Sequence, residues 1–524
     1  MLIEGRPLPP PSVAPHDLLR AGLAAGPDRL AAISAVRHLT WRALDDESSA
    51  LAARYRQLGL APGDRLASLM PNRIDLLVHY LACFKARVVA TPLNYRYTAR
   101  EIDHALEVSG AGALLVHAER AEDLAASRLA ATLPQGTIAY GGELPGARHG
   151  FEALLDAPPL ALDGAPPAPD DAAVIFFTSG STGPAKGVTH THETLRWMFA
   201  SCAAGLELSA DDVALPASSM SHVGSFLWSF AALSVGAQVI VARSYDAYEV
   251  LPLLRAHRPT FMAMVPAALA AFVRDHDVSA GDLASLRLCR TGSDMVSAEL
   301  LSEFAQLAGI PLDEGYGMTE VGLATVNPPS GVIKQGSIGR PIDGFCISIR
   351  DDSDGLLGTG AVGRVWIRTR SRMAGYWEDP AATAEVLRDG WIDSGDLAHA
   401  DDDGYLWFFG RKKQIIVHDG SNISPREVEG ALMEHPAVAL VGVVGIHDVV
   451  HGENVRAYVT LRPQTARPAA DELILFCRER VGYKAPEEVV FLGEMPLNPT
   501  GKIDRVGLKR MAEEHVHEAG AGAR

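Results

Sequence analysis

The sequence predicts an α/β protein with a large N-terminal domain of helix-covered sheets, a small β-rich subdomain and a small α+β domain at the C-terminal end. Three observations predict this architecture. Segments with helical periodicity alternate with short apolar runs in the first part of the chain. Strand signals predominate from about residue 330. The chain has 524 residues, more than one hydrophobic core usually supports.

The predicted elements of the first part of the chain are helices and the buried strands of a parallel sheet. Apolar residues recur at helical spacing in residues 19–26, 47–60 and 74–86. Short apolar runs, typical of strands buried on both faces, occupy residues 65–70, 88–93, 112–118 and 172–180. A connection rich in Pro, Ala and Asp covers residues 158–171, and it is either a linker between subdomains or a loop.

The pattern changes twice in the second half of the chain. Residues 336–352, 363–370 and 404–410 carry strand patterns between turn residues, which predicts a β-rich subdomain from about 330 to 410. Residues 411–446 then predict a strand, a tight turn, a helix and a strand, with Ser424 at the helix N-cap and Pro425 in its first turn. We therefore expect an N-terminal domain over residues 1–410 and a C-terminal domain over residues 411–524.

Charge and cysteine content narrow the classes of partner and compartment. The formal net charge of −17 argues against binding to nucleic acid or to an anionic membrane surface. The five cysteines are scattered, so we expect neither a disulfide framework nor a zinc site, and a reducing cytoplasm fits. The N-terminal residues lack the basic and apolar regions of a signal peptide, and no run of 18 apolar residues predicts a membrane span.

The most informative segment is residues 178–188, with the sequence TSGSTGPAKGV. Its hydroxyls, its glycine backbone N–H groups and its single lysine, Lys186, are the groups that hold a polyphosphate. Glycine allows the backbone to approach phosphate oxygens that a Cβ would keep away. The spacing is not that of a Walker A loop, and a flexible loop is the alternative for this segment taken alone.

Six further segments follow this loop in order. They are ASSMSHVGSF (217–226), DEGYGMTE (313–320), GSIGRP (336–341), WIDSGDLA (391–398), FGRKKQIIVHDGSNISPREVE (409–429) and PLNPTGKIDR (496–505). Together with the loop they resemble the adenylate-forming superfamily, which contains acyl-CoA synthetases, adenylation domains of nonribosomal peptide synthetases and luciferases. The resemblance covers nearly the whole chain.

The resemblance implies that ATP and Mg²⁺ bind to the matched motif residues. The β- and γ-phosphates of ATP would contact Thr178, Ser179, Gly180, Ser181, Thr182, Gly183 and Lys186. The remainder of the nucleotide would contact Ser293, Asp294, Glu314, Gly315, Tyr316, Gly317, Thr319, Asp396, Arg411 and Lys502. Within this set, Tyr316 would stack on adenine, Thr319 would bind the α-phosphate and Asp396 would accept the ribose hydroxyls. Glu320 would ligate Mg²⁺, a hard cation that takes few carboxylates and keeps water.

Two positions in these motifs depart from the family pattern. The family usually has proline where this chain has Ala185, directly before Lys186. It often has threonine where this chain has Ser394. Both departures leave the expected hydrogen-bond donors in place.

The resemblance also implies two half-reactions. A carboxylate first attacks the α-phosphate of ATP, and a thiol then attacks the acyl adenylate while AMP leaves. Lys502 would be the catalytic lysine, with Thr319, Glu320 and His222 as further catalytic residues. The C-terminal domain would be mobile about a hinge at Lys413, and in its second orientation a channel for the pantetheine of CoA would be lined by Asp419, Gly420 and Ser421.

The implied acyl pocket lies around His222 and is largely apolar, as small-molecule pockets usually are. Its candidate lining residues are His222, Val223, Gly224, Phe226, Trp228, Met262, Met264, Thr291, Gly292, Val321 and Leu323. For the methionines and aromatic residues, an ordinary core position is the alternative. Adenylation domains for α-amino acids carry an aspartate just after this histidine, whereas residues 221–230 contain no acid. We therefore expect an apolar acid, aliphatic or aryl, without an α-amino group.

The sequence is compatible with three functions. The leading hypothesis is an acyl-CoA synthetase for a carboxylic acid. The first alternative is a stand-alone adenylation enzyme that loads a carboxylic or β-amino acid onto the phosphopantetheine of a carrier protein. Asp294 lies in a segment that departs from the family pattern, and it contacts either the nucleotide or a polar group of such an acid. The second alternative is a binding protein without catalysis, against which the complete motifs argue; assembly as a homodimer is left open.

Overall fold

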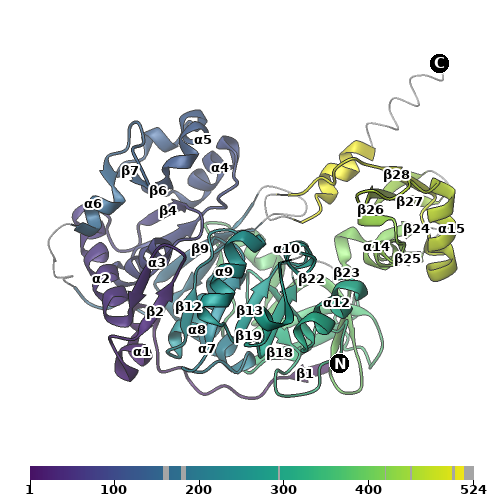
Figure 1. Ribbon diagram of the computed structural model, residues 1–524, viewed down its shortest axis with the longest axis horizontal. Helices are drawn as coiled ribbons and strands as arrows, with labels where there is room; N and C mark the ends of the chain where they lie inside the picture. Colours follow the sequence, from purple (N-terminus) through teal and green to yellow (C-terminus); the bar gives the residue numbers. More distant parts are fainter. Residues whose placement is uncertain are drawn as a thin grey trace.

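The computed structural model describes residues 1–156, 164–178, 185–275, 277–292, 296–418, 421–448, 451–498 and 502–512. Four sheets run through these residues, and three of them belong to a large N-terminal domain (Figure 1). The fourth sheet belongs to a smaller C-terminal domain, drawn in yellow-green. The predicted division into a large helix-covered domain and a small α+β domain is confirmed, whereas the boundary at residues 410 and 411 stays a prediction.

The first sheet carries the strand that leads into the phosphate loop. Its eight strands follow the spatial order β20 (Gly375–Tyr376), β10 (Gly187–Thr191), β9 (Ala172–Phe177), β5 (Val89–Pro92), β4 (Arg65–Leu69), β6 (Ala113–His117), β7 (Gly136–Tyr140) and β8 (His149–Gly150). The strands from β9 to β8 pair in parallel. The four predicted strands are β4, β5, β6 and β9, so the predicted parallel sheet is confirmed.

The second sheet carries most of the other motif residues. Its nine strands follow the order β17 (Arg340–Pro341), β16 (Gly322–Val326), β15 (Leu312–Met318), β14 (Leu288–Gly292), β13 (Phe261–Met264), β11 (Val213–Ala217), β12 (Gln238–Ile240), β2 (Leu30–Ile33) and β3 (His38–Thr40). The strands from β15 to β2 are parallel, while β16, β17 and β3 run antiparallel to their neighbours.

Helices fill the space between these two sheets and cover their outer faces. One hydrophobic core joins both sheets to α2 (Trp41–Gln57), α3 (Ile74–Ala86), α7 (His192–Gly205) and α8 (Val223–Ser234). Helix α3 is buried on nearly every side, which its almost continuous apolar sequence favours. The outer face of the first sheet packs against α4 (Ala99–Ser109), and that of the second against α9 (Ala247–His257), α10 (Pro266–Val273) and α12 (Ala298–Ala308).

Shorter helices complete the N-terminal domain at its edges and connections. They are α1 (Arg20–Ala25), α5 (Ala121–Ala126), α6 (Phe151–Asp156), α11 (Ala280–Leu283) and α13 (Pro380–Val386). None of the helices in the described ranges is long and apolar enough to cross a bilayer.

The third sheet is the predicted β-rich subdomain. It contains β1 (Leu2–Glu4), β18 (Phe345–Arg350), β19 (Gly363–Thr369), β22 (Trp391–Ala400), β21 (Leu387–Arg388) and β23 (Leu406–Arg411). The subdomain is less self-contained than the sequence suggests, because β1 comes from the start of the chain while β17 and β20 join the other two sheets. Such exchanges give edge strands the backbone hydrogen bonds that they would otherwise lack.

The fourth sheet forms the core of the C-terminal domain. It contains β25 (Ser421–Ile423), β24 (Ile416–His418), β27 (Gly452–Leu461), β26 (Val438–Asp448) and β28 (Glu488–Phe491), packed against α14 (Pro425–Met433) and α15 (Ala470–Val481). Ser424 is the N-cap of α14 and Pro425 starts the helix, as predicted. The Ser424 hydroxyl does not cap the helix; it donates to the carbonyl of Phe409 on β23 and so joins the two domains.

Candidate active site

The predicted nucleotide-binding segments meet at one edge of the second sheet. Strands β13 and β14 end at Met264 and Gly292, and β15 continues through Tyr316 into the turn that holds Thr319 and Glu320. The carboxyl ends of parallel strands form the edge where ligands bind in open α/β sheets. The predicted residues Ser179, Gly180, Ser181, Thr182, Gly183, Ser293, Asp294, Asp419 and Gly420 lie outside the described part of the chain.

The two described ends of the phosphate loop are held together. The Thr178 backbone N–H donates to the carbonyl of Lys186 at 3.2 Å, next to the antiparallel pairing of β9 with β10. The carbonyl of Ala185 accepts a hydrogen bond from Nε2 of His104, on α4, at 2.9 Å. His104 therefore anchors the loop directly before Lys186.

The Lys186 ammonium lies over the ring of Tyr376, with Nζ 4.9 Å from the ring centroid. The Tyr376 hydroxyl in turn donates to Oε1 of Glu320 at 2.9 Å. Burial raises the pKa of Glu320, and the hydrogen bond from Tyr376 partly offsets this rise. Tyr376 carries no signal in the sequence, because its strand β20 lies in the predicted β-rich subdomain and reaches the site only by joining the first sheet.

The turn of Thr319 and Glu320 is fixed through its carbonyl groups. Nε2 of His190 lies 2.8 Å from the carbonyl oxygen of Thr319, and the Met373 N–H donates to the carbonyl of Glu320 at 2.7 Å. Burial lowers the pKa of His190 to about 4, so its imidazole is neutral at physiological pH and donates from Nε2. His190 is a supporting residue of the site that carried no signal in the sequence.

Asp396, on β22, is buried beside two partners. The Tyr316 hydroxyl donates to its Oδ2 at 2.7 Å, and Nε of Arg411 lies 3.2 Å from its Oδ1. Oδ1 nevertheless has no partner with hydrogen-bond geometry in the described residues. Burial raises the pKa of Asp396, while Arg411, Tyr316 and the charge of Lys502 lower it. A buried acceptor of this kind is suited to a ribose hydroxyl.

Glu314 offers a second acceptor without a partner at this edge of the sheet. Its side chain is buried, and Oε1 has no hydrogen-bond partner among the described residues. Burial raises the pKa of Glu314 to about 7, although the charge of Arg426 on α14 lowers it in part. Glu314 lies two residues before Tyr316, so its free oxygen suits the amino group of an adenine ring.

The glycines on either side of Tyr316 are required by the packing of the protein itself. A Cβ at Gly315 would lie 1.6 Å from Nη2 of Arg290, and a Cβ at Gly317 would lie 2.3 Å from the carbonyl oxygen of Gly322. Such distances cannot be accommodated without moving the backbone or a buried guanidinium. These two glycines are therefore explained without a bound nucleotide.

The predicted acyl residues divide into a half-buried and a fully buried group. His222 is the N-cap of α8 and, with Val223 and Gly224, is half-buried at the start of that helix. Nε2 of His222 lies 3.3 Å from Nδ2 of Asn94, which the sequence did not single out. Burial, with a contribution from the charge of Lys502, lowers the pKa of His222 to about 4, so the imidazole is neutral.

The fully buried group contains Phe226, Met264 and Val321. The Phe226 ring lies in the central core, with its centroid 4.5 Å from that of Phe230 and 5.0 Å from that of Phe176. Phe226 therefore occupies an ordinary core position, which was the alternative for the aromatic residues of this segment. A place in the acyl pocket stays a prediction for all three residues.

Lys502 reaches the same site from the C-terminal domain. Its backbone N–H donates to Oδ1 of Asn498 at 3.0 Å, and the Asn498 N–H donates to the Lys502 carbonyl at 2.7 Å. Its charge contributes to lowering the pKa of both Asp396 and His222. The other C-terminal residues lie on separate elements, with Lys413 in the turn after β23 and Ser421 on β25, and their roles stay predictions.

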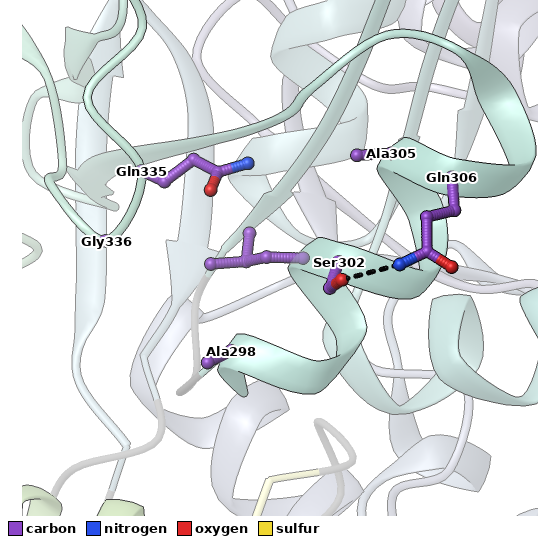
Figure 2. Close-up of a pocket in the computed structure, with 7 residues that line it drawn as sticks. Ala298, Ser302, Ala305, Gln306, Gln335 and Gly336 are labelled. Atoms are coloured by element: carbon purple, nitrogen blue, oxygen red, sulfur yellow. Dashed lines mark hydrogen bonds between the residues drawn. The ribbon is translucent and has the colours of Figure 1, made fainter.

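A surface cavity of about 520 Å³ lies between α12 and the turn before β17 (Figure 2). It is lined by Ala298, Leu301, Ser302, Ala305, Gln306, Gln335 and Gly336. Its polar groups are partly engaged with each other, since Nε2 of Gln306 donates to the Ser302 hydroxyl at 3.0 Å. None of the predicted site residues lines this cavity, so it is distinct from the predicted acyl pocket.

Comparisons with known proteins agree with this arrangement. The AMP-binding enzyme family matches residues 19–377, and the AMP-binding enzyme C-terminal domain matches residues 427–502. A feruloyl-CoA synthase of Amycolatopsis sp is 35% identical over 504 residues, covering 93% of this chain and 99% of the relative. The fatty acid–[acyl-carrier-protein] ligase ScoC of Streptomyces coeruleorubidus is 32% identical over 482 residues, covering 90% of this chain and 91% of the relative.

Solved structures of CoA ligases share this fold. A benzoate CoA ligase from Burkholderia xenovorans LB400 superimposes with a TM-score of 0.84 at 27% identity, covering 95% of this chain and 99% of the other. The match extends over both domains, as the family matches do. The chain therefore belongs to the adenylate-forming superfamily, of the acyl-CoA synthetase type, and is an AMP-forming acid–thiol ligase.

Proposed function

We propose that this enzyme converts an apolar aryl carboxylic acid without an α-amino group into its CoA thioester. The observation that carries the proposal is the start of α8, where His222, Val223 and Gly224 are half-buried and residues 219–234 contain no acid. The surroundings that keep His222 neutral disfavour any positive charge. An α-ammonium group would be unpaired there, at a cost of several kcal/mol.

The names of the relatives support an aryl acid in particular. The feruloyl-CoA synthase and the benzoate CoA ligase both act on aryl acids, and each covers nearly the whole chain. The half-buried indole of Trp228, one turn along α8 from Gly224, is a suitable partner for an aryl ring. The carrier-protein ligase among the relatives keeps a carrier protein as the alternative acceptor.

The described residues would divide the nucleotide between them. Glu314 Oε1 would accept from the adenine amino group and Asp396 Oδ1 from a ribose hydroxyl, because neither buried oxygen has a hydrogen-bond partner among the described residues. Lys186, held beside the Tyr376 ring, would contact the phosphates. Glu320 would supply one carboxylate to Mg²⁺, whose remaining ligands would be phosphate oxygens and water, since no cluster of three or more metal-ligating side chains occurs among the described residues.

The reaction proceeds in two steps. In the first, a carboxylate oxygen bonds to the α-phosphorus and the bond to pyrophosphate breaks; two anions approach each other, and the ammonium groups of Lys186 and Lys502 offset the charge that develops. Bound Mg²⁺ would add charge neutralisation at the phosphates. In the second step the CoA sulfur, having lost its proton, attacks the acyl carbon and the bond to AMP breaks.

The proposal also covers the cellular compartment of the enzyme and its binding partners. All five cysteines are buried and unpaired, which favours a reducing compartment such as the cytoplasm. The proposed partners are the acid and CoA.

A panel of acids tests the proposal directly. Pyrophosphate release is measured with and without CoA for ferulate, benzoate, 3-phenylpropanoate, phenylalanine, 3-amino-3-phenylpropanoate and a long-chain fatty acid, and thioester formation is followed by mass. We expect the aryl acids to be activated and thioesters to appear with CoA. A preference for phenylalanine over 3-phenylpropanoate contradicts the acid assignment, and a preference for the fatty acid contradicts the aryl assignment.

Two further experiments test the choice of acceptor and the electrostatic argument about the acid separately. Transfer to a phosphopantetheinylated carrier protein but not to CoA overturns the choice of acceptor. A matched pair of variants tests the electrostatic argument: Val223→Asp should narrow the preference for 3-phenylpropanoate over phenylalanine, whereas Val223→Asn, which has the same shape without the charge, should leave the preference unchanged.

A further inference from the structure

Tyr376 lies between two groups that the proposed function assigns to MgATP. One face of its ring contacts the Lys186 ammonium, at 4.9 Å from the centroid. Its hydroxyl donates to Oε1 of Glu320 at 2.9 Å. The cation that would hold phosphates and the carboxylate that would hold Mg²⁺ are therefore joined through one phenol ring.

The backbone of Tyr376 is fixed on both sides. In the pairing of β10 with β20, Tyr376 is opposite Val188, two residues after Lys186, and the Trp377 N–H donates to the carbonyl of Gly187 at 2.7 Å. On the other side, the Tyr376 N–H donates to the Thr383 hydroxyl at 2.9 Å. This register places the ring beside the end of the phosphate loop, so its position does not depend on Lys186 or Glu320.

The charges on either side of the ring explain why a tyrosine is useful here. A lysine and a glutamate that touched would attract each other strongly, because the Coulomb attraction grows as two opposite charges approach. The two side chains of such a pair would neutralise each other before the nucleotide bound. Lys186 is exposed and makes no ion pair with the described residues; its cation is held by a neutral ring instead.

We infer that Tyr376 is a positioning residue for MgATP: it keeps Lys186 and Glu320 apart and orients each toward its own part of the substrate. The ring acts on Lys186 and therefore on the phosphates. The hydroxyl acts on Glu320 and therefore on the metal. This inference rests on the proposed function, which assigns Lys186 and Glu320 to MgATP.

Calorimetric titration of ATP into the full chain, with excess Mg²⁺ or with EDTA, distinguishes the contribution of the Tyr376 ring to ATP affinity from that of its hydroxyl. Tyr376→Phe keeps the ring and removes the hydroxyl, so we expect the Kd to rise about tenfold with Mg²⁺, as for a hydrogen bond to a charged group, and to stay unchanged with EDTA. Tyr376→Leu removes the ring as well, and we expect weaker binding in both conditions.

Tyr140→Phe is the matched control, because the Tyr140 hydroxyl also donates to a carboxylate, Asp75, at 2.8 Å but lies away from the site. It should bind ATP as the wild type does in both conditions. Wild-type affinity of Tyr376→Phe with Mg²⁺, or an equal loss with Mg²⁺ and with EDTA, overturns the inference. If Tyr376→Leu does not fold, Tyr376→Phe alone decides the question.

The binding experiment is independent of the acid. A wild-type chain that binds MgATP but activates none of the acids contradicts only the proposed function. A wild-type chain that activates aryl acids while Tyr376→Phe binds MgATP normally contradicts only the role of Tyr376.

Discussion

Arg462, directly after β27, and Glu299, in the first turn of α12, form an ion pair with two contacts between the domains, at 3.1 Å and 2.5 Å. Arg274 approaches the same carboxylate at 3.4 Å. The pair belongs to the arrangement in which the charge of Lys502 acts on Asp396. The partly exposed pair stabilises this arrangement by up to about 1 kcal/mol, and we predict that the first half-reaction takes place in it.

Glu299→Gln should lower the rate of adenylate formation about two- to fivefold, as expected for the loss of a partly exposed ion pair. The rate of thioester formation from supplied acyl adenylate should not fall, because that step does not need Lys502 in the site. Stopped-flow measurement of the two half-reactions checks this, and the difference from wild type should disappear at high salt. Glu434→Gln is the control, since Glu434 pairs with Arg480 inside one domain; an equal effect of both variants would contradict the prediction.

Lys502→Ala should reduce adenylate formation by about 10²–10³, the usual effect of removing one preorganised charge from a reacting centre. Thioester formation from supplied adenylate should be spared. Pyrophosphate release and thioester formation are measured separately. Lys509→Ala is the control, because Lys509 is a half-exposed lysine of the same domain, 3.6 Å from Glu453. Equal losses in both half-reactions, or none in either, would remove Lys502 from its assigned role.

Gly420→Trp should block thioester formation and leave adenylate formation nearly intact, if the segment of Asp419 and Gly420 lines the thiol channel. The prediction rests on the sequence resemblance, since both residues lie outside the described ranges. The same two half-reactions are measured, with Gly493→Trp as a control at an exposed glycine that has open space around it. A parallel fall in adenylate formation would show that the tryptophan acts by another route.

The pH dependence of stability should contain a contribution from Glu314. Burial raises the pKa of its carboxyl group to about 7 from an ordinary value of 4.5, so between these values the folded protein binds the proton that the unfolded chain releases. The free energy of unfolding therefore falls as the pH rises through this window. Relative to wild type, Glu314→Gln should gain up to about 3 kcal/mol between pH 4.5 and pH 7.

Urea unfolding without nucleotide, followed by fluorescence across this pH range, measures the effect. Asp313, whose pKa burial raises to about 6, should leave a smaller dependence of the same sign in the Glu314→Gln variant. Glu143→Gln, at an exposed glutamate, is the control and should follow the wild type. Parallel stability curves for Glu314→Gln and wild type would show that Glu314 is ionised in the folded state.

The parts of the fold and site that the sequence predicts are those with local signals. Helix α3 and strands β4, β5, β6 and β9 lie where their apolar patterns place them, because each pattern is set by residues close in sequence. The resemblance covers nearly the whole chain, so it also predicts that the distant motif residues Tyr316, Glu320 and Asp396 converge.

The parts that could not be predicted depend on contacts between distant segments. The pairing of β20 with β10, which brings Tyr376 to Glu320, has no local signal in either strand. The same holds for His190 and Asn94, whose partners Thr319 and His222 are more than 120 residues away. Phe226 could be read as a pocket residue or a core residue, since only the rings packed around it decide between the two.

The exchange of strands among the three N-terminal sheets has a consequence for synthesis of the chain. The sheet that starts with β1 needs β18, the sheet of the phosphate loop needs β20, and the second sheet needs β16 and β17. None of the three is therefore complete until at least 341 residues have left the ribosome. Long-range pairing of this kind is slow and leaves open edges exposed while it waits. The growing chain should thus depend on chaperones until residue 376 has emerged, and fragments that end before β20 should aggregate instead of folding.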